Sequence, residues 1–122
     1  MRGIEFRGKR EDNGKWVFGS LLSWDAGERH ICCEEDDNEA MGKFPVIPET
    51  VGEYTGLLDK NGVKIFEGDI VRYKGMELAV RWDTEKAGFF IGNDKYWMMN
   101  GTDIEVIGNI HDNPELLNKN IV

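Results

Sequence analysis

The stretch from Glu53 to Tyr73 constrains the fold more than any other part of the chain, and it reads EYTGLLDKNGVKIFEGDIVRY. Two short apolar runs flank the tetrapeptide from Asp59 to Gly62, and Asn followed by Gly suits the positive φ angles of a tight hairpin. Because strands this short bury only one face each, the stretch predicts a β-hairpin within a mainly β protein.

A second turn follows at Glu67-Gly68-Asp69 and leads into a further strand, in which Val71 and Tyr73 alternate with polar residues. Glycine adopts backbone conformations that other residues avoid, and aspartate accepts hydrogen bonds from nearby backbone amides. We therefore expect Gly68 to adopt a backbone conformation that is unfavourable to other residues, and the Asp69 carboxylate to serve the turn itself.

Alternating apolar residues mark further strands on both sides of this region. The clearest runs from Glu77 to Trp82, and the last runs from Ile104 to Ile110, where Gly108 is expected to relieve crowding at a bend. Short strands joined by tight turns often close into a barrel, so we predict a small, partly open barrel over residues 68–110. Its expected core is Val71, Tyr73, Leu78, Val80, Trp82, Ile104 and Val106.

The N-terminal part predicts a hairpin of its own, with Asp12-Asn13-Gly14 at the turn and with Trp16 and Phe18 on one face. His30 to Cys33 has the composition of a brief strand. Pro45 and Pro48 favour an edge or connecting segment over Phe44 to Ile47. Near the C-terminus, Asn113 followed by Pro114 is typical of the start of a short helix.

Four segments in this order resemble the YopX family, small proteins of bacteriophages and prophages: MRGIEFRGKREDNGKWVFGSL, VIPETVGEYTGL, YTGLLDKNGVKIFEGDIV and IEVIGNIHDNPELL. The segment 25–43 departs from that pattern. The resemblance implies a mostly β structure with a small SH3-like barrel, and it implies self-association. It implies no enzymatic activity and supplies no catalytic residues.

The length and the charge distribution limit how many domains the chain can form and where they lie. We expect one compact unit of 122 residues with two regions, an N-terminal hairpin and acidic loop over 1–53 and the SH3-like barrel over 54–122. The net charge of −8 is unevenly distributed: residues 1–33 carry +1, 34–53 carry −6, and 100–122 carry −3. No apolar run approaches the roughly 20 residues of a membrane span, which favours the bacterial cytoplasm.

Several residues have the chemistry of a site but lack the partners that a site needs. His30, Cys32, Cys33 and Glu34 are metal-ligand types without a second ligand pair, and we expect two free thiols. The acidic loop 34–39 lacks the spaced oxygen ligands of a calcium site. His111 with Asp112, and Glu67 with Asp69, come without a nucleophile. We therefore expect no catalytic, cofactor-binding or metal-binding residues, and no enzyme.

A stacking platform for single-stranded nucleic acid is the alternative from a different functional class. The aromatic and basic residues that would form it are Trp16, Trp82, Phe89, Phe90, Tyr96, Trp97, Arg72, Lys74, Arg81, Lys86 and Lys95. This alternative is less favoured, because residues 66–99 carry −1 and four of the aromatic residues fall at expected core positions.

The favoured hypothesis is a non-enzymatic phage or prophage accessory protein that self-associates and binds a protein partner. Nine apolar residues lie outside the expected barrel and would need burial elsewhere, which favours a homo-oligomer that uses the first hairpin and the segment from Phe44 to Val51. They are Ile4, Phe6, Trp16, Phe18, Leu21, Phe44, Val46, Ile47 and Val51.

Overall fold

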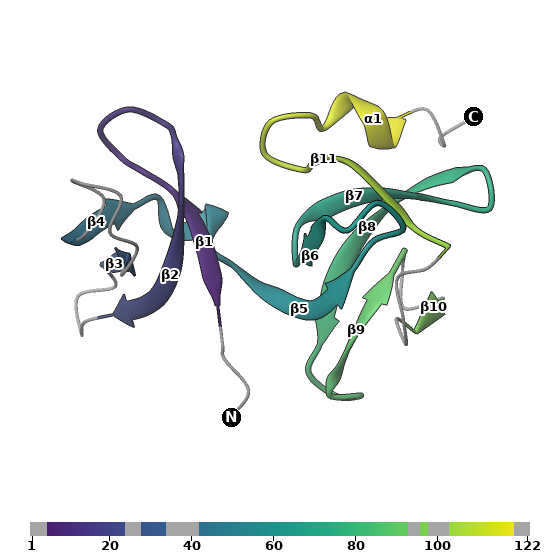
Figure 1. Ribbon diagram of the computed structural model, residues 1–122, viewed down its shortest axis with the longest axis horizontal. Coiled ribbons are helices and arrows are strands. Elements are labelled where there is room, and N and C mark those ends of the chain that lie inside the picture. Colours follow the sequence, from purple (N-terminus) through teal and green to yellow (C-terminus); the bar gives the residue numbers. More distant parts are fainter. Residues whose placement is uncertain (1–4, 24–27, 34–41, 93–95, 98–102, 119–122) are drawn as a thin grey trace. The chain divides into compact units, whose positions relative to one another are not determined.

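The computed structural model describes residues 5–23, 28–33, 42–92, 96–97 and 103–118, and it confirms the all-β class (Figure 1). The chain divides into two compact units, Met1–Tyr54 and Thr55–Val122. Its elements are β1 Phe6–Lys9, β2 Trp16–Ser23, β3 Arg29–Cys33, β4 Gly42–Val46, the 3₁₀ turn η1 Pro48–Thr50, β5 Gly52–Leu58, β6 Lys64–Phe66, β7 Asp69–Tyr73, β8 Met76–Asp83, β9 Gly88–Ile91, β10 Tyr96–Trp97, β11 Glu105–Asn109 and α1 Glu115–Asn118.

The first unit contains β1 to β4 of a six-stranded antiparallel sheet, and β5 runs from the first unit into the second. The strand order is β4-β3-β2-β1-β5-β6, and β5 pairs with β1 at its start and with β6 further along (Figure 1). The predicted hairpin is present as β1 and β2, and the predicted brief strand is β3. β4 ends the strand order, which agrees with the edge position expected from its prolines.

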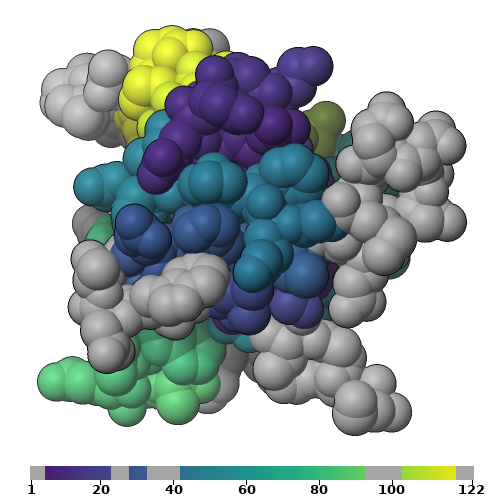
Figure 2. Space-filling model, turned by 90° about the vertical axis from the view of Figure 1, so that its left-hand side faces the viewer, coloured from purple at the N-terminus to yellow at the C-terminus, as the bar shows by residue number. Residues whose placement is uncertain are grey.

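The far end of β4 returns to β1, so that the four strands curl around a core of their own. Arg10 and Val46 form an antiparallel bridge, and the Ile47 amide donates to the Lys9 carbonyl at 2.9 Å. Gly8 permits this approach, because a Cβ at that position would lie 3.0 Å from the Val46 Cβ. Figure 2 looks onto this unit and shows β3 in blue beside the segment 42–50 in teal.

This core accounts for most of the apolar residues that seemed to need a second subunit. Ile31 and Val46 are fully buried, and Phe6, Val17, Leu21, Phe44 and Val51 pack against them. Phe6, Leu21, Phe44, Val46 and Val51 are therefore packed within one chain, so the need to bury them no longer favours an oligomer. Ile4 lies outside the described residues, while Phe18 and Ile47 stay exposed.

The second unit contains the sheet β10-β9-β8-β7-β11 together with the hairpin of β5 and β6 (Figure 1). Its core consists of Ile65, Val71, Val80, Ile91 and Ile104, with Leu57, Tyr73, Leu78, Phe89 and Val106 packed against it. Six of the seven predicted core residues are in this cluster. No pairing between β10 and β11 closes this sheet in the part of the chain that the structure describes.

Trp82 is the core prediction that the structure contradicts. It lies opposite Phe89 in the β8–β9 ladder, at the end of the ladder beyond Val80 and Ile91, and its side chain is 44% exposed. The two rings meet edge to face, with their centroids 4.9 Å apart. Alternation correctly assigns Trp82 to the same side of the strand as Val80, but the buried core does not extend as far along the strand as Trp82.

Gly68 has a φ angle of 95°, which confirms the predicted backbone conformation that other residues avoid, and it is buried. We expect Gly68→Ala to lower the free energy of unfolding by about 1 kcal/mol or more, because alanine is strained in this conformation. Chemical denaturation measures the change. The reciprocal substitution Ala87→Gly is the control, since Ala87 has a φ angle of 55° and should lose no stability. An unchanged unfolding midpoint for Gly68→Ala would contradict this account of the turn.

The last strand is interrupted at Gly108, where the register between β11 and β7 shifts. A Cβ at Gly108 would lie 2.6 Å from the Asn113 Oδ1, which confirms that a glycine relieves crowding there. The shift ends the predicted alternation, and Ile110 is 37% exposed in the following turn. Asn113 and Pro114 precede α1 as expected, and the Leu116 amide donates to the Asn113 carbonyl at 3.0 Å.

Candidate functional site

The face of the first hairpin opposite the one that packs on Ile31 and Val46 combines two cations with two aromatic rings. In the β1–β2 register Arg7 lies opposite Phe18 and Lys9 lies opposite Trp16. Because side chains alternate along a strand, these four residues share one face, while Phe6 and Val17 point to the core. We call Arg7, Lys9, Trp16 and Phe18 the hairpin face. The sequence correctly predicted Trp16 and Phe18 on one face.

Both cations of the hairpin face contact the same ring. The Arg7 guanidinium carbon lies 4.7 Å from the centroid of Trp16, and the Lys9 ammonium lies 5.8 Å from it. Such contacts hold an indole in one orientation through the negative charge on its ring face. Arg7 is only 7% exposed, whereas Phe18 is 43% exposed. The hairpin face therefore has a buried cation, a positioned indole and an exposed phenyl ring.

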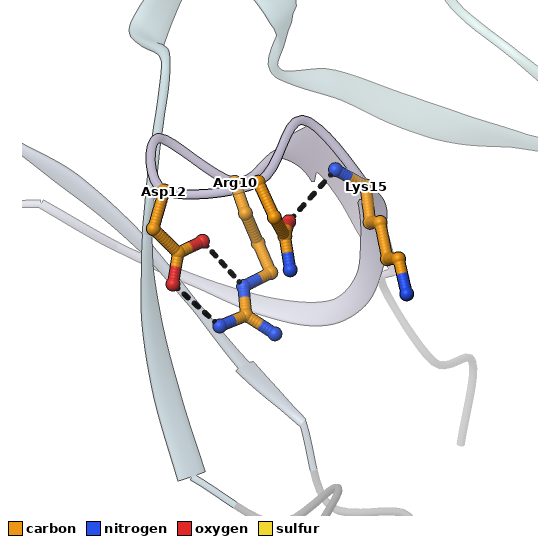
Figure 3. Close-up of polar contacts among 4 residues, drawn as sticks. Arg10, Asp12 and Lys15 are labelled. Carbon is orange, nitrogen blue, oxygen red and sulfur yellow. Dashed lines mark hydrogen bonds and ion pairs between the residues drawn. The ribbon is translucent and has the colours of Figure 1, made fainter.

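The turn of this hairpin is held by its own side chains (Figure 3). Arg10 donates to both carboxylate oxygens of Asp12, at 3.0 and 2.7 Å, and the Asn13 Oδ1 accepts the Lys15 amide at 2.9 Å. The hydrogen bond from Arg10 is the largest cause that lowers the pKa of Asp12 below its ordinary value of 3.8. Gly14 supplies a φ angle of 74°. Arg10 and Asp12 thus offset each other's charge, and the Lys15 side chain stays exposed.

The Asp59 carboxylate accepts three hydrogen bonds from backbone amides, and it serves the fold. Its Oδ1 accepts the amides of Asn61 at 2.8 Å and Val63 at 2.9 Å, while its Oδ2 accepts the amide of Val106 at 2.9 Å. Burial acts most strongly on the pKa of Asp59 and raises it, but the amides of Val106, Val63 and Asn61 together lower it below 3.8. Asp59 therefore ties the hairpin turn to β11.

This arrangement corrects the simple Asn-Gly interpretation of the turn. Gly62 has the expected positive φ angle of 83°. Among the described non-glycine residues, however, only Lys74 and Ala87 have positive φ angles, so Asn61 does not. The turn is closed instead by the Asp59 side chain and by the bond from the Asp59 amide to the Val63 carbonyl, at 2.8 Å.

The other residues with site chemistry are also engaged locally. The Asp69 Oδ2 accepts the Phe66 amide at 2.7 Å, as predicted for a turn residue. The Asn109 Oδ1 accepts the backbone amides of His111 and Asp112, both at 2.9 Å. These contacts show that Asp69 and the pair His111–Asp112 lie in hydrogen-bonded turns.

The metal-type residues are only partly described. His30 and Cys32 lie on β3, whereas the acidic loop 34–39 and the side chain of Cys33 lie outside the described part. In the described ranges no three His, Cys, Asp or Glu side chains group as metal ligands do. Nor do those ranges contain a helix long and apolar enough to cross a membrane.

The residues of the predicted stacking platform are divided between the two units. Trp16 belongs to the first unit, while Trp82, Phe89 and Phe90 lie on β8 and β9. Phe90 is buried, with the Lys86 ammonium 5.2 Å from its centroid. Lys95 and the side chains of Tyr96 and Trp97 lie outside the description. The platform predicted from the sequence did not include Arg7 and Lys9. Alternation along β1 and the turn at Asp12–Gly14 would have placed them opposite Phe18 and Trp16.

None of the curated proteins is significantly similar to this chain. A family model described as YopX protein matches residues 5–118. The match covers nearly all of the chain, including both units and the hairpin face. The chain therefore belongs to the YopX protein family.

Proposed function

We propose that the protein is a non-enzymatic, cytoplasmic phage or prophage accessory protein that self-associates and acts through a protein partner. We also propose that its second unit is an SH3-like, partly open barrel. The support for self-association is a cationic, apolar surface at the end of the β5–β6 hairpin. The support for a binding role over an enzymatic one is that Asp59 and Asp69 are buried and engaged with backbone amides.

Leu58 and Val63 carry the proposal of self-association. Their side chains are 49% and 47% exposed, and they flank the turn from Asp59 to Gly62, which the bond from the Asp59 amide to the Val63 carbonyl closes. Lys60 and Lys64 are exposed in the same hairpin. Because Asp59 is only 5% exposed, its charge faces the backbone, and the exposed charges of this turn are cationic. A second copy of this acidic chain is complementary in charge, and it would cover the two apolar side chains.

Sedimentation velocity at micromolar concentration tests this proposal. We expect the wild-type protein to sediment as an oligomer, and the double variant Leu58→Ser/Val63→Ser to shift toward the monomer because it loses the apolar contact. Phe18→Ser is the matched control, since it removes an exposed apolar side chain from the first unit instead. A wild-type mass that stays monomeric over a tenfold rise in concentration would exclude self-association.

A further inference from the structure

We propose that Asn61 is a site of spontaneous covalent modification, at which deamidation of the side chain loosens the turn that Asp59 closes. Asn61 and Gly62 lie in the turn between β5 and β6. The proposal goes beyond self-association, and it holds whether or not the chain associates.

The reaction uses two groups of the chain and water. The backbone nitrogen of Gly62 attacks the side-chain carbonyl carbon of Asn61, its proton passes to solvent, and ammonia leaves as a cyclic succinimide forms. Water then breaks one of the C–N bonds of the imide. The product is aspartate, or isoaspartate in which the main chain runs through the side chain. Glycine hinders this attack least, because it has no Cβ and adopts many backbone conformations.

The described residues contain a second Asn-Gly pair in a similar turn, Asn13 with Gly14. The Gly62 amide donates to the Asp59 carbonyl at 3.0 Å, and the Gly14 amide donates to the Arg10 carbonyl at 3.0 Å. The φ angles of the two glycines are 83° and 74°. The two attacking nitrogens are therefore held in the same way.

The two asparagine side chains are held differently. The Asn13 Oδ1 accepts the Lys15 amide at 2.9 Å, which fixes the plane of the side-chain amide (Figure 3). The Asn61 side chain is exposed and makes no hydrogen bond within the described part of the chain, where only its backbone amide is engaged, by the Asp59 Oδ1. Attack requires the carbonyl carbon to turn its face toward the glycine nitrogen. Asn61 reaches this orientation without breaking a side-chain hydrogen bond, so it should react first.

Either product disturbs the hydrogen bonds of Asp59. The Asp59 Oδ1 accepts the amides of Asn61 and Val63, and the Asp59 amide donates to the Val63 carbonyl. Isoaspartate adds a carbon atom to the main chain between these ends. Aspartate adds a second negative charge two residues from Asp59, and like charges repel. Because the Asp59 Oδ2 also accepts the Val106 amide, deamidation should weaken the contact with β11 as well.

Peptide mapping of the full-length protein by mass spectrometry, during storage in warm, mildly alkaline buffer, tests the proposal. Cleavage after glutamate separates Asn61, Asn13 and the third Asn-Gly asparagine, Asn100, into the peptides 54–67, 12–28 and 86–105. We expect the folded protein to deamidate several-fold faster at Asn61 than at Asn13. The two rates should converge in urea, because the contacts of both turns are then lost.

Asn61→Gln is the matched variant, because its longer side chain forms the corresponding imide far more slowly. Since the replaced side chain is exposed, the fresh variant should unfold at the same urea concentration as the wild type. On storage the unfolding midpoint of the wild type should fall, whereas that of Asn61→Gln should change much less, although Asn13 and Asn100 are still present. The proposal is overturned if Asn13 reacts as fast as Asn61 in the folded protein, if the difference in rate persists in urea, or if both proteins lose the same stability on storage.

Discussion

Replacing Asp59 by alanine is expected to lower the free energy of unfolding by about 3 to 5 kcal/mol, because three part-buried backbone amides lose a charged acceptor. Two of these amides shape the turn at Asn61 and Val63, and the third belongs to Val106 on β11. Urea unfolding followed by circular dichroism measures the change. Asp12→Ala is the control, since it removes an exposed carboxylate and should cost far less.

The two oxygens of Asp59 can be tested separately with Asp59→Asn. The amide oxygen can still accept from Asn61 and Val63, but the NH₂ group would face the Val106 amide, a second donor. We therefore expect a loss of stability between that of the wild type and that of Asp59→Ala. If Asp59→Ala unfolds within about 1 kcal/mol of the wild type, the carboxylate does not hold the hairpin to β11.

Asp59 also makes stability depend on pH. Since its folded pKa lies below the unfolded value of about 3.9, its contribution is fully present above that pH and is lost as pH falls through the folded pKa. The stability of the wild type should thus fall more steeply than that of Asp59→Asn below roughly pH 4. Parallel slopes for the two proteins in this range would be evidence against the lowered pKa.

Replacing Ile31 by alanine is expected to cost about 2 to 5 kcal/mol, because it opens a cavity in a fully buried site of the first unit. Since each unit has its own core, the loss should be local to the first unit. Amide hydrogen exchange resolves the effect, and faster exchange is expected for the strands β1–β4.

Ile65→Ala is the matched variant for the second unit, where Ile65 is also fully buried. It should accelerate exchange in β7–β9 and leave β2 and β3 close to the wild type. If either variant accelerates exchange equally in both units, the two cores unfold as one cooperative body, and the division into two units has no energetic meaning.

Local patterns predicted most of the strands and turns. The positive φ angles of Gly62 and Gly68, the turn role of Asp69 and the edge position of β4 all follow from residues within a few positions of one another. Glycine permits positive φ angles, proline fixes φ, and asparagine and aspartate side chains bond to the nearby backbone, whatever the rest of the chain does. For the same reason the all-β class was accessible before the structure.

The candidate site could be predicted only in part from the sequence. Alternation placed Trp16 and Phe18 on one face of β2, but the cations opposite them depend on the β1–β2 register. That register is set by the turn from Arg10 to Lys15, in which Arg10, Asp12 and Asn13 bond to one another or to the backbone. A shift of one residue would turn Arg7 and Lys9 to the core side.

The sequence by itself determined the strand-and-turn character of the chain, because short-range steric and hydrogen-bonding preferences act within a few residues. Only the tertiary structure decided that the N-terminal apolar residues pack on Ile31 and Val46, that Trp82 lies beyond the end of its core, and that Asp59 reaches Val106. Such contacts join residues far apart in the chain, as the 47 positions between Asp59 and Val106 show. They depend on how strands pair and where a core ends, and neither is encoded in the period of a single strand.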